Sequence, residues 1–277
     1  MEMRFGYPVK RQQGGGVEVL HQVKSDIFLS CGIPVQEDPR FKAYVEPFGM
    51  NNPKVWHKYW HTYRVEYYAE TLAESLNLNG DAYQTACLCG LLHDIGRFRQ
   101  VTEYNTFIDQ KSMDHGTLGA EILEKEGIVD RFTTKPEQAR EIILATREHN
   151  KYTISDELDE EELFFAKLVR DADKLDILHF WGNKAENGEV SREYFDEIMN
   201  EKLVHRKGEK ETGLDSILGL LSFIYDMNFR KSFEILNADR IVEKKIGLLR
   251  KYAANLSQAE IDELAKKLGE KIRAEIS

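Results

Sequence analysis

From about residue 55 to residue 182, the chain repeats apolar residues at spacings of three and four. This is the pattern of amphipathic helices, and almost no stretch shows the alternation of a β-strand. Several of these helices also carry a His or Asp on the apolar stripe or at the helix end, where a polar side chain is costly unless it has a partner. The sequence therefore predicts an all-α fold in which crossing helices bring imidazole and carboxylate groups together.

Capping residues, glycine and proline indicate where the expected helices begin and end. One helix is expected to end at Gly96 after starting at an Asp81 cap, and another to start behind Asp114. A proline is tolerated in the first turn, so Pro136 can open the helix that reaches His149. The expected helices cover about 53–76, 81–96, 136–149 and 161–180, with one more that starts at about 115 and continues through 123.

Three regions follow from composition. Residues 1–50 hold four of the six prolines and a run of three glycines, which predicts an irregular N-terminal arm with one short helix within about 17–29. Residues 51–182 form the expected helical core, and residues 183–277 a C-terminal helical extension packed on it. The last helix opens with a capping box, Ser257 with Glu260, and is expected to pack on the domain or on the second subunit of a homodimer.

Charge and cysteine content narrow the function classes. The formal net charge of −10 argues against binding long nucleic acid through a basic surface. The three cysteines have no disulfide or zinc-finger spacing, and no stretch is apolar for long enough to be a signal core or a membrane span. A cytoplasmic protein without a membrane partner is expected.

The polar residues on the apolar stripes are candidate metal ligands. Imidazoles and carboxylates at one point suit first-row transition metals, and a carboxylate can bridge two ions. A lone His in a core more often has a hydrogen-bond partner than a metal, and that interpretation is given to His21, His57, His179 and His205. The candidates are His61, His93 with Asp94, His115, His149, and an aspartate within Asp171-Ala172-Asp173.

The local sequence around these residues resembles the HD superfamily of metal-dependent phosphohydrolases over roughly residues 57–181. The order His, His-Asp, Asp is that family's signature. It is carried by three segments: His61-Thr62-Tyr63-Arg64-Val65, Leu91-Leu92-His93-Asp94-Ile95-Gly96-Arg97, and Val169-Arg170-Asp171-Ala172-Asp173-Lys174-Leu175-Asp176. The implied fold is an HD-domain helical bundle with an N-terminal arm and additional C-terminal helices.

Two further segments are similar to the subset of the family that holds two metals: Asp114-His115-Gly116-Thr117-Leu118-Gly119-Ala120 and Thr146-Arg147-Glu148-His149-Asn150. The resemblance then implies one or two divalent ions (Fe, Mn, Co, Ni or Zn), with Asp94 as the shared ligand. Helical periodicity allows either Asp171 or Asp173 to be the ligand, since both faces of that helix are apolar. The family's sequence motif favours Asp173. The implied ligands are His61, His93, Asp94 and Asp173 for one ion, and Asp94, His115 and His149 for the other.

The resemblance implies hydrolysis of a phosphate ester or anhydride, in a nucleotide or small phosphorylated metabolite, by a metal-activated hydroxide. Catalytic roles are expected for Asp94, Arg97, Lys174 and Asp176. Asp176 would hold a water, a substrate hydroxyl or a ligand imidazole. Positive charge is needed for the phosphate oxygens, and each candidate has a salt-bridging role as its alternative. These candidates are Arg64, Arg97 and Lys174.

Two other functions stay open on the ligand set alone. Some HD proteins with the same ligands hold two irons and activate oxygen, and a non-catalytic nucleotide-binding sensor would need only a binding pocket. The segment Tyr104-Asn105-Thr106-Phe107 is expected to pass over the metal mouth, where its aromatic residues either contact substrate or, as favoured, pack in the core.

Overall fold

The computed structural model describes residues 3–4, 7–8, 36–205 and 211–277. These belong to two compact units, Met1–Gln36 and Glu37–Ser277. In the first unit the two-residue strands β1 (Met3–Arg4) and β2 (Tyr7–Pro8) pair antiparallel. The helix expected within about residues 17–29 lies outside the described residues.

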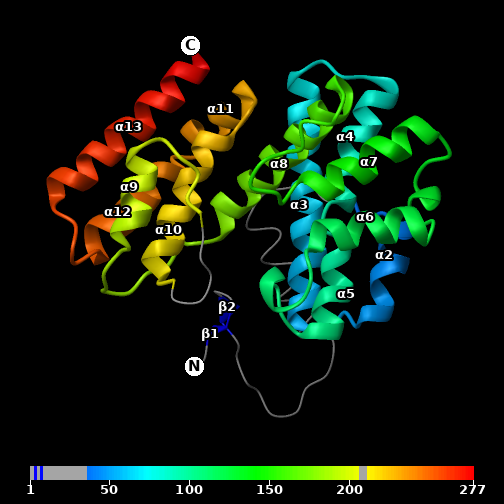
Figure 1. Ribbon diagram of the computed structural model, residues 1–277, viewed down its shortest axis with the longest axis horizontal. Helices are drawn as coiled ribbons and strands as arrows, with labels where there is room; N and C mark the ends of the chain where they lie inside the picture. The colour runs from blue at the N-terminus through cyan, green and yellow to red at the C-terminus, as the bar shows by residue number, and fades with distance from the viewer. Residues whose placement is uncertain (1–2, 5–6, 9–35, 206–210) are drawn as a thin grey trace. The chain divides into compact units, whose positions relative to one another are not determined.

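The second unit is built of helices, which confirms the all-α prediction (Figure 1). The α-helices are α2 (Pro39–Val45), α3 (Pro53–Ser75), α4 (Gly80–Leu92), α5 (Ile95–Tyr104), α6 (His115–Lys125), α7 (Pro136–Glu148), α8 (Glu160–Phe180), α9 (Arg192–Met199), α10 (Gly213–Ser222), α11 (Arg230–Ala238), α12 (Ile241–Tyr252) and α13 (Gln258–Ile276). Short 3-10 helices lie between them: η1 (Glu46–Phe48), η2 (Asp109–Lys111), η3 (Val129–Arg131) and η4 (Phe223–Asp226). Among the described residues, no helix is both long and apolar enough to cross a membrane.

The first group of helices packs around α3, α4, α7 and α8, and α6 lies between α5 and α7. Gly90 of α4 allows a close approach to α3, because a Cβ there would come within 2.8 Å of the Glu66 backbone. Buried side chains such as Leu72, Leu92 and Val169 fill the space between these helices. The apolar stripes found in the sequence therefore form the core that positions the candidate ligands.

Most expected helix ends agree with the structure, and one region differs. Asp114 caps α6 by accepting the Thr117 N–H, whereas α4 follows Asn79 and carries Asp81 in its first turn. The sequence predicted that a helix ends at Gly96. This is wrong, because Gly96 lies in the first turn of α5. The reason for a glycine at this position is packing, since a Cβ on Gly96 would come within 2.4 Å of the His115 carbonyl oxygen of α6.

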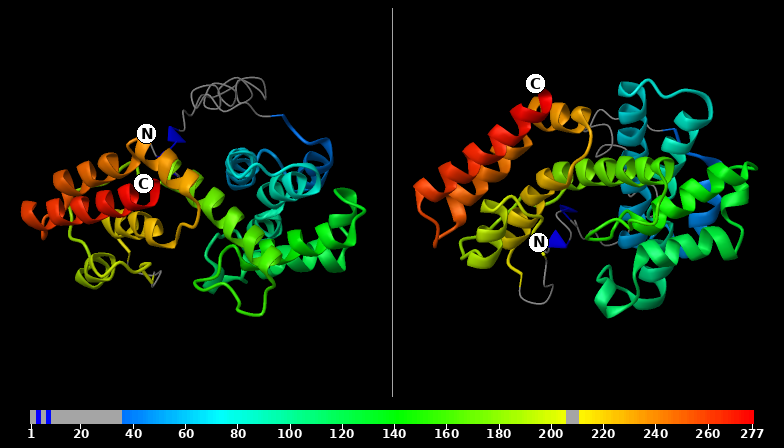
Figure 2. Two further views of the ribbon diagram at one scale, coloured as in Figure 1. Left: turned by 90° about the horizontal axis from the view of Figure 1, so that it is seen from above. Right: turned by 45° about the horizontal axis from the view of Figure 1, so that its top comes forward.

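The C-terminal helices α9–α13 form a second group that meets the first along α8 and α3 (Figure 2). The capping box of Ser257 with Glu260 is present, as predicted. The apolar stripe of α13 is buried against α11 and α12 within the chain, at Ile261, Leu264, Leu268 and Ile272. A homodimer is thus not needed to cover this stripe and stays a prediction, as do the region boundaries at residues 50 and 182.

One buried carboxylate ties the second group to α8. Asp171 accepts hydrogen bonds from the backbone N–H groups of Asn228 and Phe229, from the Asn228 amide and from the Ser232 hydroxyl, all at 2.7–3.0 Å. These donors lie at the start of α11, where N–H groups lack partners within the helix. Asp171 therefore acts as a structural cap for a helix far away in sequence.

Removal of this carboxylate should loosen the junction between the two groups of helices. We expect Asp171→Ala to lower the free energy of unfolding by about 2–4 kcal/mol, because several buried donors lose their acceptor. Urea unfolding measures this, with the exposed Glu263→Ala as a matched control that should change stability by less than about 0.5 kcal/mol. A loss for Asp171→Ala as small as that of the control would contradict the assignment.

Candidate metal centre

Six helices, α3 to α8, deliver the predicted ligands to one buried place. His61 lies in α3 and Asp173 in α8, while His93 and Asp94 form the junction between α4 and α5. His115 is the first residue of α6, and His149 follows the last residue of α7. Five of the six implied ligands, the four histidines and Asp94, are at most 5% exposed, and the Asp173 side chain is 17% exposed.

The first group of ligand atoms gathers around Oδ2 of Asp94. Nε2 of His61 lies 3.3 Å from this oxygen and 3.1 Å from Oδ1 of Asp173. Nε2 of His93 lies 3.5 Å from the same Asp94 oxygen and 3.3 Å from Nε2 of His61. These four atoms have the spacing of ligands around one cation, and they come from the four residues implied for one ion.

The second group gathers around the other oxygen of the same carboxylate. Nε2 of His115 lies 3.4 Å from Oδ1 of Asp94, and Nε2 of His149 lies 3.7 Å from it. The two imidazole nitrogens are 3.1 Å apart. Asp94 therefore presents one oxygen to each group, which is the arrangement expected of a bridging ligand.

Each histidine is oriented by a hydrogen bond from its Nδ1–H, which leaves the lone pair of Nε2 available to a metal ion. His93 donates to the Gly90 carbonyl and His149 to the Thr146 carbonyl, both at 2.7 Å and both within the preceding helix. His61 instead donates to Asp176 at 2.6 Å. His115 donates to Asp109 at 2.7 Å. Each group thus has one histidine held by a carbonyl of the preceding helix and one held by a carboxylate, which for His115 lies six residues away and for His61 lies 115 residues away. Such supporting groups are common around bound metals.

The unpaired atoms of these residues fit a bound metal ion. Oδ1 of Asp94 and Oδ1 of Asp173 are buried without a hydrogen-bond donor, and imidazole lone pairs face one another in both groups. Burial lowers the pKa of His93 and takes that of His115 down to about 4, so both rings favour the neutral form that binds metals. Burial also lowers the pKa of His61, but hydrogen bonds to Asp173 and Asp176 raise it to about 9.

Asp176 and Arg64 form a support for His61. The Arg64 guanidinium donates to both Asp176 oxygens, at 2.5 and 3.1 Å, and stacks over the Phe180 ring. Burial alone would raise the pKa of Asp176, but Arg64 and His61 lower it to about 2. Of the three roles open for Asp176, the structure shows the one in which it holds a ligand imidazole. Arg64, expected to contact substrate, is 5% exposed and is engaged in holding Asp176.

Arg97 lies beside the ligand cluster, and its catalytic and substrate-binding roles stay predictions. Its Nη1 donates to Gln100 and to the Phe107 carbonyl at 2.7 Å and to Asp109 at 3.0 Å, while its Nε lies 3.5 Å from Oδ1 of Asp94. The Phe107 ring lies beside this guanidinium. Core packing was predicted for Tyr104, but its side chain is 46% exposed, so that prediction is wrong.

Lys174 and Asp171 point elsewhere. The Lys174 ammonium pairs with Asp226 of η4, which also pairs with Arg170, and it lies over the Phe223 ring. A substrate-binding or catalytic role for Lys174 has no contact with the ligand cluster to support it and stays a prediction. Of the two aspartates left open by periodicity, Asp173 lies at the cluster, and Asp171 has the structural contacts described above.

The sequence reasoning missed two residues. Lys58 pairs with Oδ2 of Asp94 at 2.5 Å, and its position three residues before His61, on the same helix face, was a usable signal. Asp109, which orients His115, lies in η2 after a helix that was not expected, so no spacing rule pointed to it.

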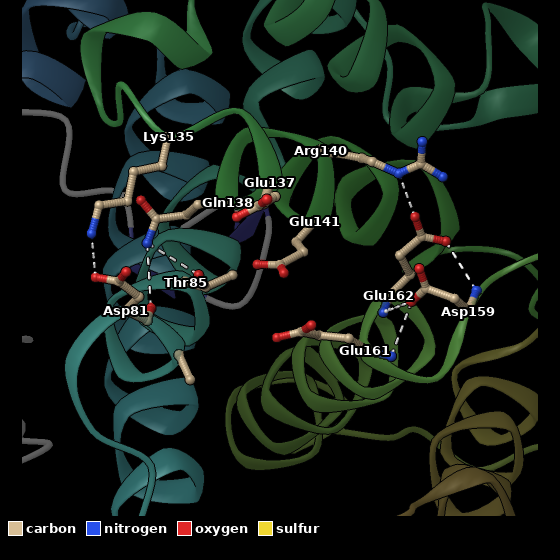
Figure 3. Close-up of a pocket in the computed structure, with 11 residues that line it drawn as sticks. Asp81, Thr85, Lys135, Glu137, Gln138, Arg140, Glu141, Asp159, Glu161 and Glu162 are labelled. Atoms are coloured by element: carbon tan, nitrogen blue, oxygen red, sulfur yellow. Dashed lines mark hydrogen bonds and ion pairs between the residues drawn. The ribbon is translucent and has the colours of Figure 1, made fainter.

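A pocket at the other end of the bundle is separate from this centre. It lies at the first turns of α4, α7 and α8, whereas the ligands of α4 and α7 follow their last turns (Figure 3). Within it Lys135 pairs with Asp81, and Arg140 with Glu162. None of the candidate ligands lines this pocket.

Comparison with known families agrees with the geometry. The family model described as HD domain matches residues 59–178 of the chain. This part of the chain is therefore an HD domain, the domain of a superfamily of metal-dependent phosphohydrolases, and the resemblance seen in the motifs is confirmed. No curated protein and no solved structure compared with the chain matches it.

Ligand removal should change the number of bound ions in steps. We expect two ions in the wild type, one in His115→Ala and at most one, weakly held, in Asp94→Ala, because Asp94 serves both groups. Metal analysis of protein reconstituted with manganese or nickel measures this. An unchanged ion count in His115→Ala would remove His115 from the ligand set.

The two supporting carboxylates allow a matched pair of variants. Asp176→Asn should weaken the ion at His61, and Asp109→Asn the ion at His115, each by about 10–100-fold in affinity. Titration of metal-free protein with Mn²⁺ resolves the two sites. If either variant weakened both ions equally, the separate supporting roles would be wrong.

Proposed function

We propose that the HD domain of this chain hydrolyses a phosphate ester or anhydride in a nucleotide or another small phosphorylated metabolite. The observation that carries the proposal is the shared carboxylate of Asp94, with two imidazoles on each of its oxygens. Two ions held in this way supply Lewis acidity for a phosphoryl oxygen and lower the pKa of water, so that hydroxide is available near neutral pH.

The chain's own residues supply fixed positive charge beside this centre. Arg97 is held in one orientation by Gln100, by the Phe107 carbonyl and by Asp109. A guanidinium that is already oriented can stabilise negative charge on phosphate oxygens without reorganisation during the reaction. Its side chain is 13% exposed, so solvent screens this charge only weakly.

The supporting carboxylates keep the histidines in the ligand form. Asp176 and Asp109 each accept the Nδ1–H of one histidine, and each is itself paired with an arginine. Both imidazoles therefore keep Nε2 directed at the centre while substrate and product exchange. This arrangement favours a reaction in which the protein keeps a constant set of ligands.

The proposal is tested with metal-replete protein and a panel of nucleotides, phosphorylated metabolites and a generic phosphodiester. We expect phosphate or nucleotide product to form with manganese or nickel, and Asp94→Ala to lower the rate by at least about a thousandfold, since several kcal/mol of charge stabilisation is lost. The exposed variant Glu263→Ala serves as the control and should keep the wild-type rate.

Two outcomes would overturn the proposal. If protein purified without oxygen and loaded with iron consumed oxygen as substrate disappeared, the centre would be an oxygenase. If metal-replete protein bound a nucleotide but turned over no member of the panel, a sensor function would replace hydrolysis.

A further inference from the structure

Lys58 is a partly buried cation whose charge the proposed chemistry has not used. It lies on α3 one turn before His61, and its side chain is 12% exposed. Its ammonium donates to Oδ2 of Asp94 at 2.5 Å. Among the described residues, Asp94 is its hydrogen-bond partner, and its further contact is with the Phe107 ring, at 5.8 Å from the centroid.

The oxygen that Lys58 contacts is the one that faces the first ligand group. Oδ2 of Asp94 is the oxygen within 3.3 Å of His61 Nε2 and 3.5 Å of His93 Nε2. A divalent ion held by these two histidines would bind the same oxygen as the Lys58 ammonium. Two cations on one carboxylate oxygen repel each other, so the ion and Lys58 would compete for it. Binding of the ion at this group weakens the pairing between Lys58 and Asp94.

Lys58 differs from Arg97, the cation on the other side of Asp94, in how it is held. Arg97 is fixed by three hydrogen bonds to other groups, and it keeps them whether or not Asp94 is paired. Lys58 has a flexible four-carbon stem, and its ion pair with Asp94 can be exchanged. The Phe107 ring contacts both cations, at 5.8 and 5.7 Å from its centroid, so the two charges flank one aromatic side chain next to Asp94.

We propose that Lys58 is an exchangeable phosphate-binding residue, paired with Asp94 in the metal-free protein and released to the substrate's phosphoryl group when a divalent ion takes Oδ2. This rests on the proposed function for the identity of the ligand as a phosphate. In the metal-free protein the ammonium supplies the positive charge that the buried carboxylate requires. In the loaded protein it adds a second basic group to that of Arg97.

The first experiment measures metal binding without turnover. Titration of metal-free protein with Mn²⁺ gives the dissociation constant of the first ion for the wild type, for Lys58→Met and Lys58→Gln, and for the charge-preserving Lys58→Arg. Removal of the competing charge should tighten binding at least about tenfold in Lys58→Met and Lys58→Gln. Lys58→Arg should stay close to the wild type. The control is Lys125→Met, which removes an exposed charge from α6 and should also match the wild type.

The second experiment measures binding of inorganic phosphate to the manganese-loaded protein. Loss of a charged hydrogen bond should weaken phosphate binding at least about tenfold in Lys58→Met, with Lys58→Arg retaining most of the affinity. Damage to the fold would weaken both ligands, whereas the proposal requires opposite changes: tighter metal and weaker phosphate. Unchanged or weaker metal binding in both Lys58→Met and Lys58→Gln overturns the proposal, and so does unchanged phosphate binding.

These readouts separate the role of Lys58 from the proposed reaction. If the affinities change as expected but the wild type hydrolyses no substrate of the panel, the hydrolase function fails and the role of Lys58 stands. If the wild type hydrolyses a phosphate ester but the affinities of Lys58→Met equal those of the wild type, the reaction stands and the role of Lys58 fails.

Discussion

The carboxylate of Asp94 is the constraint on which the rest of the centre depends. It is buried at the junction of α4 and α5. Two imidazole nitrogens lie 3.3–3.5 Å from one of its oxygens, and two other imidazole nitrogens lie 3.4–3.7 Å from the second oxygen. To satisfy both oxygens, α3 must approach one side of the junction and α6 and α7 the other. Gly90 and Gly96, on either side of His93 and Asp94, remove the side chains that would block these approaches.

Charges around the centre are arranged in two tiers. The outer carboxylates, Asp176 and Asp109, each have an arginine partner, Arg64 and Arg97 respectively, so neither adds uncompensated charge. The inner carboxylate Asp94 has no comparable fixed partner at Oδ2. The negative charge available to bound ions is thereby concentrated on the ligands themselves, and the supporting groups only orient the rings.

Sequence patterns predicted the parts of the molecule that depend on local rules. The bounds of α3, α7 and α8 and the ligand candidates followed from periodicity, capping residues and motif wording. The start of α5 at Ile95 was not predictable in this way, because Gly96 is required by a backbone contact with α6 and does not mark a helix end. The pairing of Lys174 with Asp226 is equally a matter of packing between regions far apart in sequence, which no spacing rule describes.

The two ways of holding the histidines have a consequence for the order in which the centre assembles. His93 and His149 bond to carbonyls three residues earlier, so their rings can adopt their final orientation as soon as α4 and α7 form. His61 waits for Asp176, which is 115 residues away in sequence, and therefore for α3 to dock on α8. His115 bonds to Asp109 only six residues away, so both histidines of its group can be oriented by contacts near in sequence. During folding, the group of His61 and His93 therefore gains its second oriented nitrogen only on tertiary closure, and high-affinity binding of its ion requires the chain to have finished folding.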